Sequence, residues 1–222
     1  MNKQKTYRVK EIFYSLQGEG AQTGRPSVFC RFSKCNLWNG REDSRADAVC
    51  NFCDTDFIGT DGQNGGIYTA DELVSFLRNI WPGNTATSPY IVFTGGEPAL
   101  QLDEKLVTAC HTKGFEVAIE TNGTLPLPSG LDWICLSPKG KSEVILNKCD
   151  ELKLVYPQAD ALPERFANIQ ARHYYLQPMA NIGDTEISTN VTRERVKATI
   201  DYCLTHPQWK LSLQTHKWLG ID

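Results

Sequence analysis

The sequence predicts an α/β protein built on a parallel sheet, and three observations support this fold class. Short apolar, β-branched runs alternate with helical patterns along the 222 residues. The predicted strands end in polar residues, and the carboxyl ends of parallel strands meet at one edge, where active sites form. A complete eight-unit barrel needs about 250 residues, so we expect an incomplete barrel or an open, doubly wound sheet.

Each predicted element rests on its own local pattern. An N-terminal strand at 7–14 precedes a series of short apolar strands at 27–32, 90–93, 115–119, 133–136, 152–156, 174–176 and 210–213. Helices are expected at 70–81, 103–113 and 192–205, and a weaker helical pattern covers 160–171. Thr69 is the expected N-cap of the first helix, and Gly114 follows the end of the second.

Composition excludes several classes of protein. Lys and Arg total 23 and Asp and Glu total 26, a formal net charge of −3, which argues against nucleic acid as a partner. No apolar run approaches the roughly 18 residues that span a bilayer. The N-terminal residues have no apolar segment of the export type, so we expect a cytoplasmic protein.

The eight cysteines fall into two groups. In a reducing compartment thiols pack, bind metals or react, and rarely form disulfides. Three thiols, Cys35, Cys50 and Cys53, lie in polar, loop-like sequence, and the last two form a C-x-x-C pair. We expect the others to pack as small apolar side chains. These are Cys30, Cys110, Cys135, Cys149 and Cys203.

Three grouped thiols are compatible with two kinds of metal site. Structural zinc usually takes four N or S ligands, and no fourth Cys or His follows at a suitable spacing. Three thiolates can instead hold a 4Fe–4S cluster with one iron left open to an exogenous chelate. Both readings, a zinc-binding adaptor and an iron–sulfur protein, remain open on the cysteines alone.

The most informative motif is Gly95-Gly96-Glu97-Pro98, directly after the strand expected at 90–93. Two glycines let backbone groups approach a ligand closely, and a carboxylate fixed there can accept hydrogen bonds from an ammonium group. Combined with the three cysteines, the motif resembles the radical S-adenosylmethionine (SAM) superfamily.

The cysteine spacing departs from the usual motif of that superfamily, C-x3-C-x2-C. Here 14 residues, 36–49, separate Cys35 from Cys50 and form a largely polar insert. The entropy of closing a loop grows only logarithmically with its length, so a surface insertion leaves the ligand geometry possible. We therefore expect one domain, residues 1–222, with an insert at 36–49 in the cluster-binding loop.

Ordered motifs along nearly the whole chain resemble the 7-carboxy-7-deazaguanine synthase family, in its form with the enlarged cysteine spacing. The matching segments are 11–20 (EIFYSLQGEG), 24–26 (GRP), 29–32 (FCRF), 50–55 (CNFCDT), 94–98 (TGGEP), 120–123 (ETNG), 137–139 (SPK), 177–179 (QPM) and 214–217 (QTHK).

The resemblance implies a homodimeric lyase with an incomplete TIM-like barrel of about six βα units. It implies conversion of 6-carboxy-5,6,7,8-tetrahydropterin to 7-carboxy-7-deazaguanine with loss of ammonia, in queuosine biosynthesis and tRNA modification. The implied cofactors are a 4Fe–4S cluster, SAM and Mg2+, with an electron donor such as flavodoxin or ferredoxin. The 5′-deoxyadenosyl radical abstracts hydrogen, so no side chain is assigned a catalytic role. Another radical SAM enzyme, such as a glycyl-radical activase, is the alternative within the superfamily.

The resemblance also assigns residues to each ligand. Cys35, Cys50 and Cys53 are the implied cluster ligands, and Thr55 is the implied Mg2+ ligand. The implied SAM contacts are Phe52, Cys53, Asp54, Gly96, Glu97, Asn122, Ser137, Pro138 and Lys139. The implied substrate contacts are Leu16, Gln17, Gly18, Arg31, Thr94, Glu120, Gln177, Pro178, Met179, Ala180, His216 and Asp222.

Elementary chemistry supports some of these assigned roles, and for other residues it allows a different role. The Arg31 guanidinium suits a substrate carboxylate. Glu120 could instead pair with a neighbouring cation, and Thr55 could cap a helix. His216 taken alone reads as a core histidine.

Overall fold

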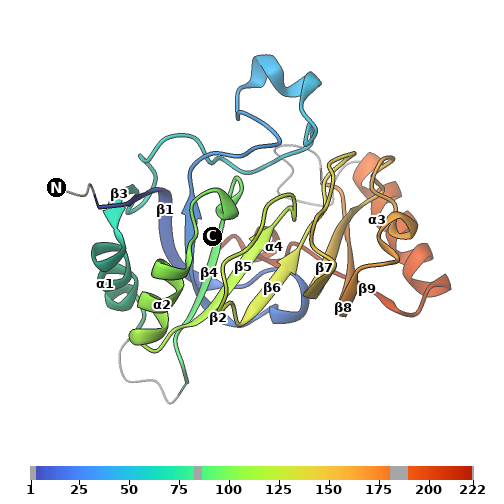
Figure 1. Ribbon diagram of the computed structural model, residues 1–222. Helices are drawn as coiled ribbons and strands as arrows, with labels where there is room; N and C mark the ends of the chain where they lie inside the picture. Colours follow the sequence, from blue (N-terminus) through green and yellow to red (C-terminus); the bar gives the residue numbers. More distant parts are fainter. Residues whose placement is uncertain (1–3, 83–86, 181–189, 222) are drawn as a thin grey trace.

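The computed structural model describes residues 4–82, 87–180 and 190–221. Its centre is a nine-stranded sheet with the order β3-β1-β2-β4-β5-β6-β7-β8-β9 (Figure 1). The strands are β1 (Thr6–Leu16), β2 (Pro26–Phe32), β3 (Gly66–Thr69), β4 (Tyr90–Gly95), β5 (Glu116–Thr121), β6 (Trp133–Leu136), β7 (Lys148–Tyr156), β8 (Gln170–Pro178) and β9 (Trp209–Leu211).

The sheet is parallel from β2 to β9, and β1 pairs antiparallel with both β2 and β3. Helix α1 (Ala70–Ile80) packs against β1 and β3, and α2 (Glu104–Thr112) packs against β5. Helix α3 (Asn190–Thr205) packs against β8 and β9 at the far edge of the sheet. A short helix, α4 (Thr215–Leu219), follows the last strand.

The expected caps set the helix starts. The Thr69 side chain accepts a hydrogen bond from the Glu72 amide, and the Glu72 carboxylate accepts one from the Thr69 amide, which completes a capping box at α1. Asp103 caps α2 by accepting from the Leu106 amide. Each cap satisfies amides that have no partner inside the helix.

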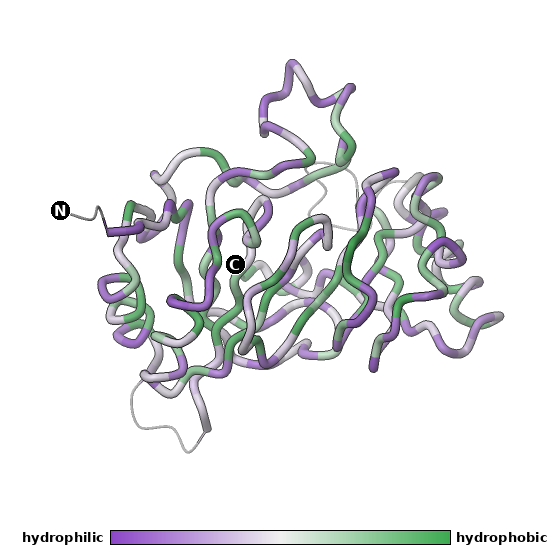
Figure 2. The backbone as a smooth tube through the Cα atoms, viewed as in Figure 1, coloured by the Kyte–Doolittle hydropathy of each residue, from purple (hydrophilic) through white to green (hydrophobic). Residues whose placement is uncertain are grey.

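Apolar side chains on the parallel strands form the core, and Figure 2 shows hydrophobic residues concentrated along the central strands. Phe32 and Phe93 from neighbouring strands stack with their ring centroids 5.4 Å apart. A second apolar cluster, around Leu136, Leu152 and Leu154, is formed by side chains from β6 to β8 and the segments packed against them. Cys30, Cys110, Cys135 and Cys149 are buried as predicted, whereas Cys203 is half-buried.

The structure corrects several sequence-based expectations. Residues 160–171 are not a helix: a single 3-10 turn at Pro163–Phe166 is followed by β8, because Pro163 lacks the amide that a helix interior requires. Strand β3 and helix α4 were not predicted, since both are too short to show a period. The connections at 122–132 and 137–147, all of them described residues, contain no helix, so fewer βα units are complete than expected.

Among the described residues, no helix is long and apolar enough to cross a bilayer.

Candidate functional site

A cavity of about 380 Å³ opens where the parallel strands end, a size typical of small-molecule sites. The polar strand ends recognised in the sequence meet around it, as the parallel sheet predicts. The predicted site residues that line it are Leu16, Gln17, Gly18, Arg31, Cys35, Cys50, Phe52, Cys53, Asp54, Thr55, Thr94, Gly96, Glu120, Asn122, Ser137, Lys139, Gln177, Pro178, Met179, Ala180 and His216.

Two of the described residues that were predicted for the site, Pro138 and Glu97, are not part of this wall. Pro138 is buried without lining the cavity. Asp222 lies outside the described residues. Glu97 is fully buried behind the wall, and its carboxylate accepts hydrogen bonds from the Ala99 amide, the Asn122 amide and the Thr121 hydroxyl.

The carboxylate of Glu97, which was predicted to meet a ligand ammonium group, is held by donors of the chain itself. Burial raises the pKa of Glu97, and its three hydrogen-bond donors partly offset that rise. The side chain therefore ties the turn after β4 to the end of β5. It fixes the backbone of both segments at the cavity edge.

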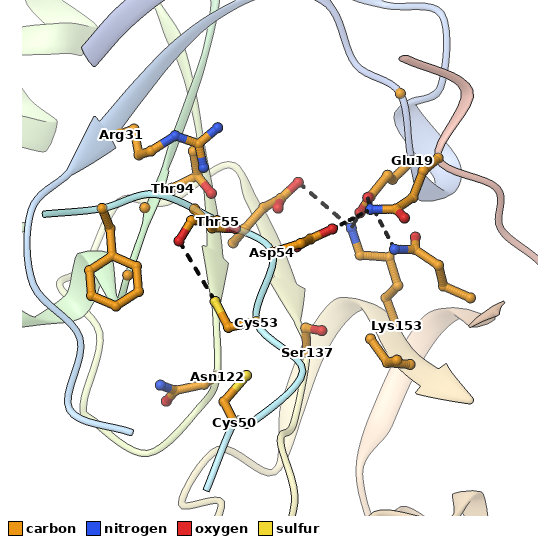
Figure 3. A pocket seen from close by; sticks show the side chains of 18 of the residues that line it. Glu19, Arg31, Cys50, Cys53, Asp54, Thr55, Thr94, Asn122, Ser137 and Lys153 are labelled. Atoms are coloured by element: carbon orange, nitrogen blue, oxygen red, sulfur yellow. Dashed lines mark hydrogen bonds and ion pairs between the residues drawn. The ribbon is translucent and has the colours of Figure 1, made fainter. Parts of the chain in front are cut away.

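The three thiols lie in one part of the cavity wall. Cys35 follows β2, whereas Cys50 and Cys53 follow the insert, and Figure 3 shows these last two beside Asn122. The Leu37 amide donates to Cys35 Sγ at 3.4 Å, and Cys53 Sγ lies 3.9 Å from the Thr55 carbonyl oxygen.

The thiols differ in how readily they ionise. A hydrogen bond from Cys50 lowers the pKa of Cys53 to about 6, against the effect of burial. The same hydrogen bond, together with burial, raises the pKa of Cys50, and burial raises that of Cys35. Metal binding must therefore displace protons from these two thiols, because the thiolate is the ligand.

The donor set fits an iron–sulfur cluster. In a cluster each thiolate binds a different iron, so three sulfur atoms need not converge on one point. Among the described residues, no three His, Cys, Asp or Glu side chains are grouped closely enough to hold a single metal ion. The three thiols instead line the same cavity from two separate segments.

The Gly95-Gly96 turn allows the chain to pass directly over Cys35. A Cβ on Gly96 would lie 2.2 Å from the Lys34 carbonyl oxygen and 2.8 Å from Cys35 Cβ. Gly95 has a φ of 128°, and a Cβ there would lie 2.2 Å from the Phe32 carbonyl oxygen. The two glycines therefore let the turn pack directly against the backbone of residues 32–35 and keep its own backbone groups at the cavity edge.

We expect Gly96→Ala to lower the iron bound per chain after anaerobic reconstitution by at least fivefold. The added methyl group must displace the backbone of Lys34 and with it the Cys35 side chain. The matched control is Gly66→Ala, whose Cβ would meet only the Tyr68 ring, at 3.0 Å. Equal iron contents in the two variants would contradict this role for the turn.

A network of charged and amide side chains forms the opposite end of the cavity, where Figure 3 shows Glu19 and Lys153. Lys153 Nζ lies 2.5 Å from Glu19 Oε2 and 3.8 Å from Glu120 Oε1. Gln17 Nε2 donates to Glu120 Oε1 at 3.0 Å, and Gln177 Nε2 donates to Glu19 Oε1 at 3.0 Å. Two carboxylates are thereby held at a buried ammonium group.

Burial and neighbouring charges shift the pKa values of Glu19 and Lys153 in opposite directions. Desolvation would raise the pKa of Glu19, but the charge and hydrogen bond of Lys153 lower it to about 2. Desolvation would lower the pKa of Lys153, but the acidic groups around it raise the pKa well above its usual value. Glu19 and Lys153 are therefore both ionised at neutral pH. Lys153 is also the neighbouring cation with which Glu120 was expected to pair if it did not bind substrate.

Gly18 and His216 form the next part of the wall. A Cβ on Gly18 would lie 2.2 Å from His216 Nδ1, so the ring packs directly on the glycine backbone. The Thr215 amide and hydroxyl donate to the Gly18 carbonyl oxygen at 3.0 and 2.9 Å. The C-terminal segment is thereby attached to the turn after β1, and His216 is half-exposed at the cavity, not a core residue.

Arg31, Thr94 and Thr55 line a further part of the wall (Figure 3). Arg31 Nε pairs with Glu11 Oε1 at 2.6 Å, and 21% of the Arg31 side chain is exposed. On the other wall, Asp54 Oδ2 pairs with Lys217 Nζ at 2.6 Å.

Five charged residues at the cavity were given no role by the sequence analysis. They are Glu11, Glu19, Asp56, Lys153 and Lys217. One signal for Lys153 was available, since a lysine interrupts the apolar strand ELKLVY. A charged side chain in a central parallel strand must find buried partners.

Comparison with known proteins finds relatives along almost the whole chain. No family model matches the chain. The 7-carboxy-7-deazaguanine synthase of Bordetella pertussis is 56% identical over 216 residues, which cover 97% of this chain and 99% of that protein. That of Bradyrhizobium diazoefficiens is 56% identical over 217 residues, with the same two coverages.

A solved structure agrees with the fold. The crystal structure of QueE from Escherichia coli matches with a TM-score of 0.67 at 26% sequence identity, and the match covers 94% of this chain and 93% of that chain. The likeness confirms the predicted incomplete barrel with its largely parallel sheet. Identity above one half over almost the whole length leaves little room for another family, so neither the zinc adaptor nor the glycyl-radical activase is retained. The chain belongs to the 7-carboxy-7-deazaguanine synthase family.

Proposed function

We propose that this chain converts 6-carboxy-5,6,7,8-tetrahydropterin to 7-carboxy-7-deazaguanine with release of ammonia. One observation carries the proposal: a single cavity joins three thiols and a Gly-Gly turn at one end to paired carboxylates and amides at the other. The first end suits a cluster and a small chelate, and the second suits a nitrogen-rich ring. The reaction requires both within one enclosed space.

The thiol end is the proposed cofactor site. Cys35, Cys50 and Cys53 would hold a 4Fe–4S cluster, which supplies the electron for reductive cleavage of SAM when both are bound. Backbone groups at Gly96 would face the methionine part of SAM. The remaining proposed SAM contacts at the wall are Phe52, Asp54, Asn122, Ser137 and Lys139.

The opposite end is the proposed substrate site. Glu120, held by Gln17 and Lys153, offers its carboxylate to the amino and ring N–H groups of a pterin. The terminal nitrogens of Arg31 are proposed to bind the substrate carboxylate, since Glu11 occupies only its Nε atom among the ion pairs of the described residues. The other proposed contacts at the wall are Leu16, Gly18, Thr94, Gln177, Pro178, Met179, Ala180 and His216.

Thr55 is the proposed protein ligand of Mg2+, a hard ion that prefers oxygen donors and keeps several waters. Its hydroxyl does not cap a helix, because residues 54–57 are irregular. The flanking carboxylates are already paired, Asp54 with Lys217 and Asp56 with Lys10. A cation at Thr55 would therefore depend strongly on the substrate carboxylate.

We expect Thr55→Ala to raise the Mg2+ concentration needed for half-maximal turnover by about tenfold and to leave the visible absorption of the cluster unchanged. Removing one neutral oxygen ligand weakens cation binding without touching the thiols. Thr108→Ala, on the exposed face of α2, is the control. Loss of cluster absorption in Thr55→Ala would show that the residue has another role.

An anaerobic assay tests the proposed function. Reconstituted protein is incubated with the carboxytetrahydropterin, SAM, Mg2+ and a chemical reductant, and the products are identified by mass spectrometry. We expect 7-carboxy-7-deazaguanine to form only when all four are present. A protein that holds a cluster, cleaves SAM and yet forms no deazapurine would overturn the proposed substrate.

Three further expectations complete the proposal. We propose a cytoplasmic homodimer, supported by exposed Trp218 and Leu219, which are 53% and 64% accessible in the single chain. We propose a single domain, supported by one sheet that takes strands from residues 6 to 211. We also propose a one-electron donor such as flavodoxin or ferredoxin, in keeping with the cluster chemistry.

A further inference from the structure

The insert at 36–49 is a folded part of the cavity wall. Its centre is a 3-10 helix at Glu42–Asp47, and Figure 1 shows it projecting beyond the carboxyl ends of the strands. Trp38 is 7% exposed, lines the cavity and packs edge-on against Phe57, with ring centroids 5.6 Å apart. The Trp38 indole N–H donates to the Arg41 carbonyl oxygen at 3.2 Å. The insert is thereby anchored by a buried aromatic ring.

Arg45 connects the insert to the cysteine loop. Its Nη1 donates to the Cys53 carbonyl oxygen at 2.8 Å and to the Asn51 carbonyl oxygen at 3.2 Å. The other side of the guanidinium pairs with Glu42, through Nε at 2.7 Å and Nη2 at 2.6 Å. Its carbon Cζ lies 4.1 Å from the centre of the Trp38 ring. Only 16% of the Arg45 side chain is exposed.

These contacts use the properties that distinguish arginine. A planar fork donates to two carbonyl oxygens and one carboxylate while its face rests on an indole, which a lysine cannot reproduce. The partners come from within the C-x-x-C segment, residues 50–53, and from the insert. The guanidinium therefore fixes the backbone of Cys53. Its permanent positive charge is hydrogen-bonded to the carbonyl oxygen of the same residue that carries the thiol.

We propose that Arg45 is a positioning residue that orders the C-x-x-C loop and raises the reduction potential of the cluster held there. This inference rests on the proposed function, because it concerns the same cluster. Reduction adds a negative charge, and a nearby cation stabilises the reduced state over the oxidised one. The carboxylate of Glu42 is 75% exposed, so water screens its opposing charge more strongly than that of the less exposed guanidinium.

The test compares Arg45→Met with Arg41→Met in the reconstituted full-length protein. Both variants remove one positive charge from the same insert, but the Arg41 side chain is exposed. We expect Arg45→Met to lower the reduced-to-oxidised ratio at a fixed solution potential about tenfold, a shift of ~59 mV for one electron, measured by a potentiometric titration followed by electron paramagnetic resonance. Arg41→Met should shift it less than twofold.

A measurement on cluster-free protein covers the case in which Arg45→Met assembles no cluster. Hydrogen exchange of the amides in residues 50–55 should be at least fivefold faster in Arg45→Met than in wild type or Arg41→Met. Arg45→Lys, which keeps the charge and loses the fork, should show faster exchange and a nearly normal potential.

Each failure has a distinct signature. Wild-type protein that binds no cluster would overturn the proposed function itself. Equal potentials in wild type and Arg45→Met, with the cluster present in both, would overturn the inference alone. If no Arg45→Met cluster forms, unchanged hydrogen exchange would overturn it as well.

Discussion

Cys50→Ala is expected to abolish SAM cleavage, with 5′-deoxyadenosine falling below one hundredth of the wild-type amount. Cys50 is buried at the cavity, so its loss removes one of the three thiolates available at this wall. With only two thiolates, two of the four irons of the cluster have no protein ligand, and a cluster bound in this way is labile. The measurement is iron and sulfide content together with chromatography of the nucleoside.

The control for this variant is Cys203→Ala. Cys203 is a half-buried thiol on α3, away from the cavity wall. It should retain wild-type iron, sulfide and 5′-deoxyadenosine within twofold. Continued release of 5′-deoxyadenosine by Cys50→Ala would remove this residue from the ligand set.

Lys153→Met is expected to reduce turnover at least a hundredfold and to lower the free energy of unfolding by about 3–5 kcal/mol at pH 7. Lys153 is 4% exposed and its Nζ pairs with Glu19 at 2.5 Å, so its removal leaves a buried carboxylate without its cation. Glu120 also loses its neighbouring positive charge at the proposed substrate site. The measurements are initial rates of deazapurine formation and urea unfolding of the cluster-free protein.

The stability loss should depend on pH in a defined direction. The folded-state pKa of Glu19 is about 2, below its usual 4.5, so its ionised form stabilises the wild type above about pH 4.5. That contribution is lost as the pH falls from 4.5 toward 2. In Lys153→Met the two lowering effects of Lys153 on the Glu19 pKa are lost, and the raising effect of burial is opposed only by His216 and Gln214. Acid relieves the cost of burying the unpaired carboxylate by protonating Glu19. The difference between the two proteins should therefore be largest at neutral pH and shrink below pH 4.5.

Lys148→Met provides the control for Lys153→Met. Lys148 starts the same strand with an exposed side chain. Its replacement should change the unfolding free energy by less than about 0.5 kcal/mol and leave turnover intact. A stability difference for Lys153→Met that stays constant between pH 7 and pH 3 would contradict the assignment of the pair.

The sequence predicted the strands and the identity of most cavity residues because both depend on local signals. Apolar runs show where strands lie, and the polar groups after them must meet at one edge of a parallel sheet. The pairing of Lys153 with Glu19 joins residues 134 positions apart and leaves no local pattern. The sequence indicated only that Lys153, as a lysine within an apolar strand, needed a buried partner.

The errors have similar causes. The helical pattern at 160–171 included Pro163, whose effect on the backbone outweighed the apolar spacing. The internal hydrogen bonds of Glu97 were a further feature that the sequence did not predict. The structure shows that neighbouring backbone amides use both of its oxygens, a result of tertiary packing that no motif reveals. The insert was a polar segment of unknown fold until the Arg45 and Trp38 contacts were visible.

The central claim is that the three thiols leave one iron of the cluster without a protein ligand, free to bind SAM beside the Gly-Gly turn. Electron paramagnetic resonance of the reduced, reconstituted protein tests it most directly. Adding SAM should change the spectrum of the cluster, and Cys53→Ala should show no such response. An identical spectrum with and without saturating SAM, in protein that holds four irons per chain, would contradict the account.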